Sequence, residues 1–178
     1  THEGILMRKY MILSGKLRRE DARPVAISTS SIALQKAILS EYIPFLSKIL
    51  QEAGIIQTPI EAIVRKGKEH FVCDRRLELR LEAIREKEKN PAQREALTSL
   101  CKNFDMDEVH GLSGFDRRLV CVPKFCPMDC PEKMDCRYQC YLKSAKGNRV
   151  SIQICNHNYL LADSAHRKND YRPLLAEY

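Results

Sequence analysis

Residues 25–38, VAISTSSIALQKAI, decide the fold class of this chain, because a short apolar run passes directly into a helical pattern. Residues 25–29 are typical of a buried parallel strand. The hydroxyl side chains of residues 29–31 are of the kind that caps helix N-termini. Apolar residues then recur at helical spacing as far as Leu50, and Pro44 is expected to break this helix in two.

A second strand is predicted at residues 60–64, IEAIV, so the first part of the chain has a β-α-β pattern. We interpret residues 1–72 as a partial α/β domain. Strand alternation returns at 150–155, VSIQIC, and a helix is expected from about Tyr159. Residues 150–178 are therefore interpreted as a return to the same α/β domain.

The segment between these parts, residues 73–149, differs in composition. Residues 74–100 are dense in charge and carry apolar residues at helical spacing, which predicts two helices separated at Asn90-Pro91. Residues 102–149 hold glycines, prolines and cysteines with little periodicity. This composition predicts an insertion that is helical at first and then rich in cysteine.

The overall composition is that of a globular protein. Of the 178 residues, 44% are hydrophobic and 30% are charged, which excludes a disordered chain. The net charge of +7 fits an anionic partner such as nucleic acid, although an ordinary charged surface would have the same excess. No apolar run has the length of a membrane span or of a signal-peptide core, so we expect no membrane association and a cytoplasmic location.

The cysteines are the strongest chemical signal in the chain. There are eight in all, and Cys126, Cys130, Cys136 and Cys140 fall within fifteen positions. In a reducing compartment such thiols are metal ligands or buried side chains more often than disulfides. Cys73 lies at the start of the insertion and would bring a fifth thiol. Three clustered thiols and one distant thiol make the four that a cubane or a tetrahedral metal requires.

The spacing leaves three alternatives open. Zinc ligands usually come as close pairs such as C-x-x-C, which this chain lacks, so the spacing favours an iron–sulfur cluster over zinc. Cysteines without any ligand are the third alternative. The remaining thiols lie in apolar patterns and are expected to act as small hydrophobic residues; they are Cys101, Cys121 and Cys155.

Four segments together resemble the XPD/DinG-type superfamily 2 helicases. Residues 26–38 resemble the motif Ia segment of that family, and residues 65–73, RKGKEHFVC, resemble the segment that carries its first cluster cysteine. Residues 126–138, CPMDCPEKMDCRY, are similar to its other three cysteines. Residues 154–163, ICNHNYLLAD, resemble the segment that precedes its DEAH box.

The resemblance implies a partial RecA-like motor domain that carries an inserted 4Fe–4S domain. Its implied ligands are Cys73, Cys126, Cys130 and Cys136, with Cys140 as the alternate for Cys136. The complete parent protein would be a helicase that uses ATP and Mg²⁺ to move 5′→3′ along single-stranded DNA. Its partners would be single-stranded DNA and the remainder of the helicase motor.

Cations and aromatic residues near the cysteines suggest a path for single-stranded DNA, since such paths combine phosphate-binding cations with rings that stack on bases. If one cluster gathers both cysteine segments, these side chains converge on one surface. The candidate DNA-binding residues are Thr29, Gln35, Arg65, Lys66, Lys68, Arg117, Arg118, Lys124, Arg137, Tyr138 and His157. For any single residue, an ordinary surface or packing role is the competing interpretation, and for His157 it is a cap on the turn after the last strand.

The chain departs from the family in its nucleotide site. No G-x-x-x-x-G-K-[ST] pattern is present, and Gly15-Lys16 is followed by Leu17, which has no hydroxyl for Mg²⁺. The last residues, RPLLAEY, stand where the DEAH strand would begin. We therefore expect a fragment that does not hydrolyse ATP by itself. The alternatives are a zinc-binding interaction module without motor activity and a helicase relative that retains only DNA binding.

One consequence concerns folding. If the cysteines bind a cluster, that cluster rather than an apolar core is expected to fold residues 102–149. Replacement of Cys130 by serine would then unfold this whole segment and spare the α/β part.

Overall fold

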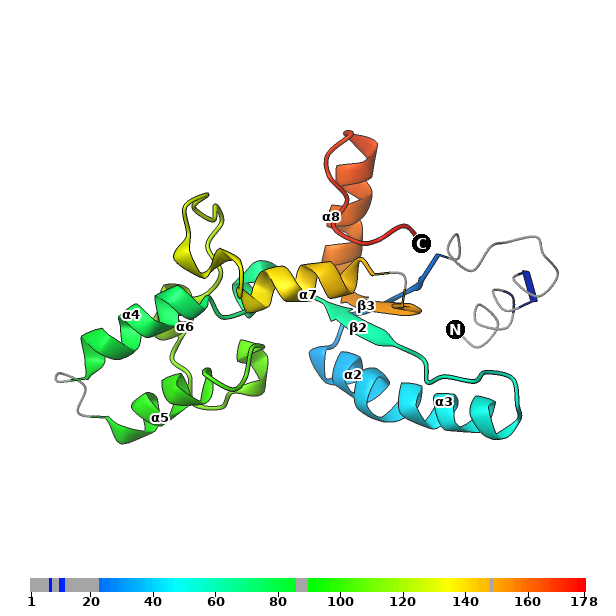
Figure 1. Cartoon of the computed structure of the whole chain (residues 1–178), viewed down its shortest axis with the longest axis horizontal. Coiled ribbons are helices and arrows are strands. Elements are labelled where there is room, and N and C mark those ends of the chain that lie inside the picture. The colour runs from blue at the N-terminus through cyan, green and yellow to red at the C-terminus, as the bar shows by residue number, and fades with distance from the viewer. Residues whose placement is uncertain (1–6, 8–9, 12–22, 86–89, 148) are drawn as a thin grey trace. The chain divides into compact units, whose positions relative to one another are not determined.

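The computed structural model describes residues 7, 10–11, 23–85, 90–147 and 149–178. The Gly15-Lys16-Leu17 segment lies outside these residues. The chain divides into two compact units. The first unit comprises residues 1–66 and 144–178, and the second comprises residues 67–143, whereas the sequence placed the insertion at 73–149. Helix α7 (Arg137–Ala145) crosses the boundary between the two units (Figure 1).

The first unit is α/β, as the sequence predicted. Its sheet consists of β1 (Val25–Thr29), β3 (Ile152–Asn156) and β2 (Ala62–Arg65), in the order β1-β3-β2. Both neighbouring pairs are parallel, with Val25 and Ala62 each opposite Ile152. The predicted strands at 25–29, 60–64 and 150–155 are therefore confirmed to within two residues.

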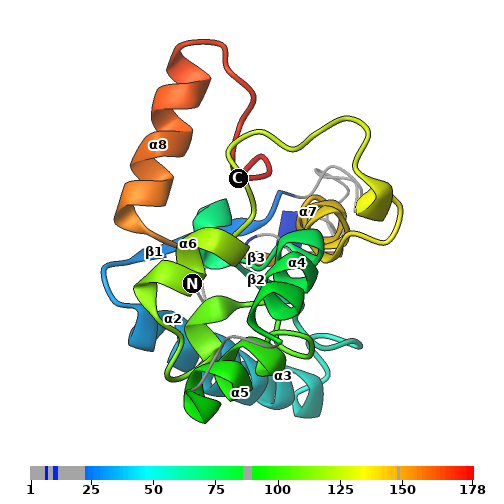
Figure 2. The ribbon, with the colours of Figure 1, turned by 90° about the vertical axis from the view of Figure 1, so that its left-hand side faces the viewer.

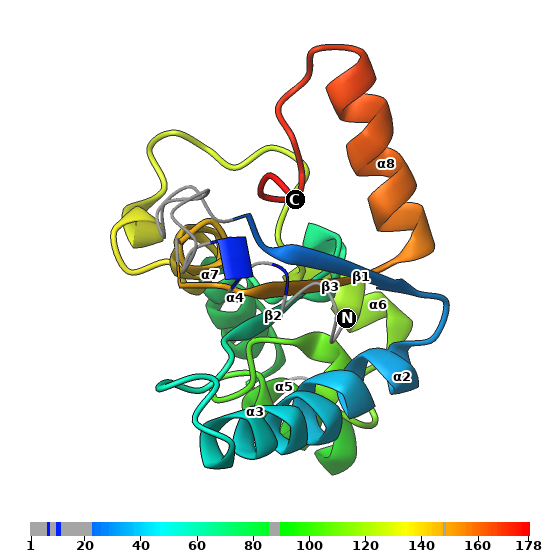
Figure 3. The same ribbon diagram turned by 90° about the vertical axis from the view of Figure 1, so that its right-hand side faces the viewer.

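Helices cover both faces of this sheet (Figure 3). Helices α2 (Ile32–Ala37) and α3 (Ile43–Glu52) lie on one face, and α8 (His157–Lys168) lies on the other. Ile43, Ile152 and Ile154 form the buried centre of the α2–α3 face. Because both faces are covered, β3 is buried along four of its five residues.

The helix after β1 continues past Pro44 through a distorted turn instead of breaking in two as expected. A π-helical turn, η2 (Ile38–Tyr42), joins α2 to α3, and the Ile43 N–H bonds to the Ile38 carbonyl five residues back. Proline lacks an N–H, and its ring would clash with the carbonyl of Ser40 in a regular helix. The wider turn relieves both problems without ending the helix.

The end of α3 depends on a glycine. Gly54 has φ of +65°, a conformation that favours glycine. The Ile55 N–H donates to the Leu50 carbonyl at 2.8 Å, and the Gly54 N–H donates to the Gln51 carbonyl at 2.9 Å. This pair of bonds is the Schellman motif, and it turns the chain toward β2.

The second unit is helical. It contains α4 (Asp74–Ile84), α5 (Pro91–Ser99), α6 (Gly114–Val120) and the first part of α7, with short turns η3 (Lys68–His70), η4 (Met106–Glu108) and η5 (Pro131–Lys133). The two helices predicted within 74–100 are confirmed as α4 and α5. Asn90 caps α5 and Pro91 occupies its first turn, which is why the chain restarts its helix there.

The second unit has an apolar core of its own, and this corrects the expectation that a cluster alone folds residues 102–149. Helix α4 packs against α5 and α6. The buried side chains are Val72, Leu77, Ile84, Leu97, Leu100, Met106 and Val120. The loop 123–136 has no buried residue, and Figure 2 shows it as a long connection between α6 and α7. Apolar burial therefore accounts for α4, α5 and α6, and the loop has no such support.

A buried carboxylate joins the three helices. Asp116 on α6 accepts hydrogen bonds from Arg80 Nε on α4 at 2.7 Å, from Ser113 Oγ at 2.6 Å and from Gln93 Nε2 on α5. Burial raises the pKa of Asp116, but the hydrogen bonds from Ser113, Gln93 and Arg80 outweigh it and hold the pKa below its ordinary value. The carboxylate is therefore charged at neutral pH and fixes the packing of α4, α5 and α6.

Candidate cysteine metal centre

Cys73 is held in place by the core of the second unit. Its N–H donates to the Val120 carbonyl at 2.8 Å, and the preceding Val72 forms an antiparallel bridge with Cys121. Cys73 is also the N-cap residue of α4, since its carbonyl accepts from the Leu77 N–H at 2.9 Å. The direction of this thiol is therefore set by backbone contacts that need no metal.

The other predicted ligands lie on or beside the loop 123–136. Cys130 is the N-cap residue of η5 and is followed by Pro131, whose fixed φ stiffens the turn. Cys136 directly precedes α7, and its carbonyl accepts from the Cys140 N–H at 3.0 Å. Cys140 thus lies one helical turn beyond Cys136, within α7.

Electrostatic coupling connects four of these thiols. Burial raises the pKa of Cys73; the Arg76 N–H and guanidinium oppose this, and Cys126 and Cys136 raise it further. Desolvation also raises the pKa of Cys126, and Cys130 and Cys136 add to that rise. Cys73 and Cys126 thus each lie within electrostatic range of other members of the preferred ligand set, although Cys73 comes from a segment more than 50 residues away.

Cys140 is not among the main causes of the raised pKa at Cys73 or at Cys126. It is exposed, whereas Cys136 is half-buried. The arrangement therefore favours Cys136 over Cys140 as the fourth member of the set.

Two of the four cysteines stand at the start of longer helices. Cys73 directly precedes α4 and Cys136 directly precedes α7. The N-terminal end of a helix carries partial positive charge and favours thiolates and anionic groups. This is a suitable environment for a cluster of thiolate-bound iron, whose ligands are all anionic.

The donor set fits a thiolate-bound metal group in its chemistry, while the side chains as placed do not close around a single ion. All eight cysteines are free thiols. Within the described residues, no three His, Cys, Asp or Glu side chains are placed to hold one metal ion.

The remaining cysteines differ in their surroundings. Cys155 is fully buried on β3, and half-buried Cys121 packs against the core of the second unit, as expected for small hydrophobic residues. Cys101 is exposed, so the expectation is wrong there. It follows the end of α5, where the apolar stripe of that helix has already ended at Leu100.

Several candidate DNA-binding residues of the second unit are engaged within it. Arg117 bonds to Asp107 Oδ1 at 2.6 Å and to the Met106 carbonyl at 2.8 Å. Lys68 donates to the Lys124 carbonyl, and Arg137 forms an ion pair with Asp74.

Tyr138 packs in a group of four aromatic rings rather than standing alone on the surface. Its ring centroid lies 5.8 Å from that of Phe71 and 6.0 Å from that of Tyr141. Phe71 in turn stacks on Phe104 at 4.7 Å. Among the sequence candidates of this unit, Arg118 and Lys124 are the exposed cations.

The candidates of the first unit are mostly buried. Arg65 and Lys66 are 2% and 8% exposed, and Gln35 and Thr29 are also buried. His157 is exposed at the start of α8, where its Nδ1 lies 2.6 Å from Ser28 Oγ. The predicted capping role belongs to Asn156, whose side chain accepts from the Tyr159 N–H at 2.6 Å.

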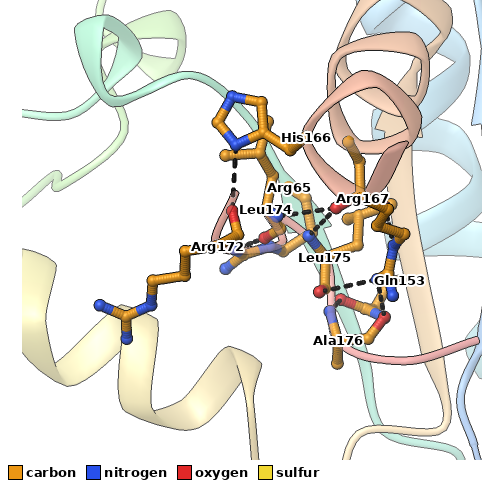
Figure 4. A network of polar contacts seen from close by, with 9 residues as sticks. Arg65, Gln153, His166, Arg167, Arg172, Leu174, Leu175 and Ala176 are labelled. Atoms are coloured by element: carbon orange, nitrogen blue, oxygen red, sulfur yellow. Dashed lines mark hydrogen bonds and ion pairs between the residues drawn. The ribbon is translucent and has the colours of Figure 1, made fainter. Parts of the chain in front are cut away.

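Arg65 belongs to a buried polar network that fastens the last residues to the sheet (Figure 4). Its guanidinium donates to the Leu174 carbonyl, and the Gln153 side chain both donates to and accepts from the backbone of Ala176. Asp163 accepts from the N–H groups of Leu174 and Leu175 at 2.7 and 2.8 Å. Through its bond to the Leu174 carbonyl, Arg65 stabilises this segment.

Sequence reasoning missed the apolar residues of the cysteine loop. Phe125, Met128 and Met134 are 82%, 89% and 85% exposed, and the ammonium of Lys124 lies 5.7 Å from the centroid of the Phe125 ring. A signal was present, because Phe125 stands between a cation and a cysteine in a segment without core residues. An exposed ring beside a cation is the unit from which single-strand stacking surfaces are built.

No helix in the described parts of the chain has both the length and the apolar character needed to cross a membrane. Comparison with protein-family models and with curated protein sequences finds no match to this chain.

Proposed function

We propose that the second unit binds a 4Fe–4S cluster through Cys73, Cys126, Cys130 and Cys136. The observation that carries this proposal is the coupling of these four thiols, which come from distant segments, with two of them at helix N-termini. An all-thiolate donor set beside positive helix ends suits an anionic cluster. The cluster would cross-link the loop 123–136, which has no buried side chain, to the core of the unit.

The unit would serve as the strand-engaging part of a larger ATP-dependent DNA helicase. This rests on the resemblance of the four sequence motifs and on the three-stranded parallel sheet, whose order and helix cover are compatible with part of a RecA-like domain. The chain's own residues would supply strand contacts, and ATP and Mg²⁺ would bind in other parts of the parent protein.

Single-stranded DNA would contact the loop through Lys124 and Phe125, with Arg118 as a further exposed cation. The lysine would neutralise a phosphate, and the ring would stack on a base. Arg117 and Arg137 would act indirectly, because their guanidinium groups already bind carboxylates.

The first test is the metal content of the chain purified without oxygen. We expect about four irons and four sulfides per chain, the composition of a cubane, with a brown colour. One zinc per chain and no colour would instead support the zinc-binding interaction module and overturn the cluster. A chain with no bound metal would overturn both.

DNA binding is tested separately, by fluorescence anisotropy with a labelled single strand. Replacement of Phe125 by alanine should weaken binding by about 1–3 kcal/mol, the value of one stacked base. Lys124→Ala should reduce the slope of log K against log salt by about 0.7, the value of one single-strand phosphate contact. The matched control is Phe115→Ala, which removes another exposed phenylalanine of the same unit. Equal effects at Phe115 and Phe125 would contradict the stacking role.

A further inference from the structure

A single ion pair joins the two chain segments that carry Cys73 and Cys136. Asp74 directly follows Cys73, and Arg137 directly follows Cys136. Arg137 Nε donates to Asp74 Oδ1 at 2.8 Å, and Nη2 donates to the same oxygen. Both side chains are about one-third exposed, so the pair is partly shielded from solvent.

Arg137 is anchored on its other sides as well. Nη2 donates to the Leu100 carbonyl at 3.0 Å, and Nη1 lies 3.4 Å from the Cys101 carbonyl. The guanidinium also lies 5.8 Å from the centroid of the Phe104 ring. These contacts hold the start of α7 against the end of α5, so the arginine has one defined position.

We propose that Asp74 and Arg137 form a positioning pair for the thiol set. The pair fixes the distance between the N-termini of α4 and α7, and with it the separation of Cys73 from Cys136. The inference rests on the proposed metal centre and extends it to residues that bind no metal. It also reassigns Arg137 from DNA contact to support of the ligands.

The physical reason is the cost of assembling ligands from distant segments. Cys73 and Cys136 are 63 positions apart, and a metal group that had to order both segments would lose binding free energy to that ordering. An ion pair formed without metal removes part of this cost in advance. Loss of a residue that orients metal ligands typically weakens metal binding by about 10–100-fold.

The experiment uses cobalt(II) as a probe of the reduced, iron-free full chain, read by thiolate-to-metal absorption. We expect Arg137→Gln and Asp74→Asn each to weaken cobalt binding by about 10–100-fold. The double variant should be no weaker than either single variant, because both remove the same interaction. Arg137→Lys should recover part of the cobalt affinity only when Asp74 is present, because lysine keeps the positive charge but lacks the planar set of guanidinium donors.

The control is Arg75→Gln, which removes an exposed arginine next to Asp74 on α4. The inference is overturned if Arg137→Gln binds cobalt like the wild type or like Arg75→Gln. It is also overturned if the Asp74 and Arg137 effects add, because the residues would then act separately.

Hydrogen exchange of α4, α5 and α6 in the iron-free variants separates positioning from loss of the fold. We expect it to be unchanged, and a general loss of protection would also overturn the inference. The iron and sulfide analysis of the wild type tests the cluster independently. The wild type could contain no iron while the Asp74 and Arg137 variants still bind cobalt more weakly than the wild type. That result would refute the cluster but support the positioning pair.

Discussion

Replacement of Asp116 by asparagine should destabilise the second unit more than any exposed change of the same kind. The side chain of Asp116 is fully buried and accepts hydrogen bonds from Arg80, Gln93 and Ser113. Asparagine has nearly the same shape, but it removes the negative charge and turns one acceptor into a donor. The arginine would then face an amide across a buried contact.

The size of the effect follows from these contacts. Breaking a buried ion pair by removing one partner costs about 3–5 kcal/mol. The Arg80 side chain is 19% exposed and can regain some water, so we expect the lower end, about 3 kcal/mol. A unit of roughly 80 residues has a total stability of about 4–12 kcal/mol. The change therefore removes a quarter or more of that stability.

Native-state hydrogen exchange of the full chain measures this loss where it occurs. A loss of about 3 kcal/mol should lower protection of the core amides of α4, α5 and α6 by roughly a hundredfold. Amides of the first unit should not change. The control is Asp129→Asn, which makes the same chemical change at an exposed position in the loop 123–136.

The pH dependence supplies a second check. Because the pKa of Asp116 is lower in the folded state, its stabilisation is fully present above the unfolded value of about 3.9. It is lost as pH falls through the folded pKa. The difference between wild type and Asp116→Asn should therefore be constant near neutral pH and shrink in acid. Wild-type protection in the variant at neutral pH would refute the reasoning.

Three further predictions concern the cysteines and the C-terminal segment. Cys136→Ser should lower the iron content of the anaerobically purified chain while Cys140→Ser leaves it unchanged, and the reverse result would move the fourth ligand into α7. Cys130→Ser should raise hydrogen exchange only within the loop 123–136, because the helices have their own core; loss of protection throughout α4–α6 would show that the metal folds the whole unit. The Asp163 carboxylate accepts hydrogen bonds from the N–H groups of Leu174 and Leu175, so Asp163→Ala should expose both amides to exchange and destabilise the fold by about 3–5 kcal/mol. Slow exchange of both amides in this variant would show that other contacts hold the segment.

Sequence patterns predicted the elements of the first unit well, because each is a local signal. Strand 25–29 and its following helix depend on apolar spacing and on capping residues that lie next to each other in the chain. The sequence predicted a break at Pro44 and not the π-helical turn that the structure shows there, because a proline can either end a helix or be accommodated within a distorted one.

The sequence named candidate ligands, which remain a prediction, but it did not give the contacts around them. Cysteine spacing named Cys73 and the loop thiols, and chemistry alone restricted what they could bind. The roles of Arg65, Arg117 and Arg137 could not be predicted from their charge, because the sequence does not distinguish an exposed arginine from one that is bonded to a carboxylate or carbonyl group. Their partners lie between 10 and more than 100 positions away.

The sequence by itself therefore determined the α/β pattern, the helices of the insertion and the four thiols, all of which follow from local periodicity or residue type. Only the tertiary structure decided that the helices of the second unit have an apolar core of their own. It also decided that Asp74 and Arg137 connect the two ligand segments. These features depend on contacts between residues far apart in the chain, and such contacts form only when burial and hydrogen bonding outweigh the entropy of bringing the segments together.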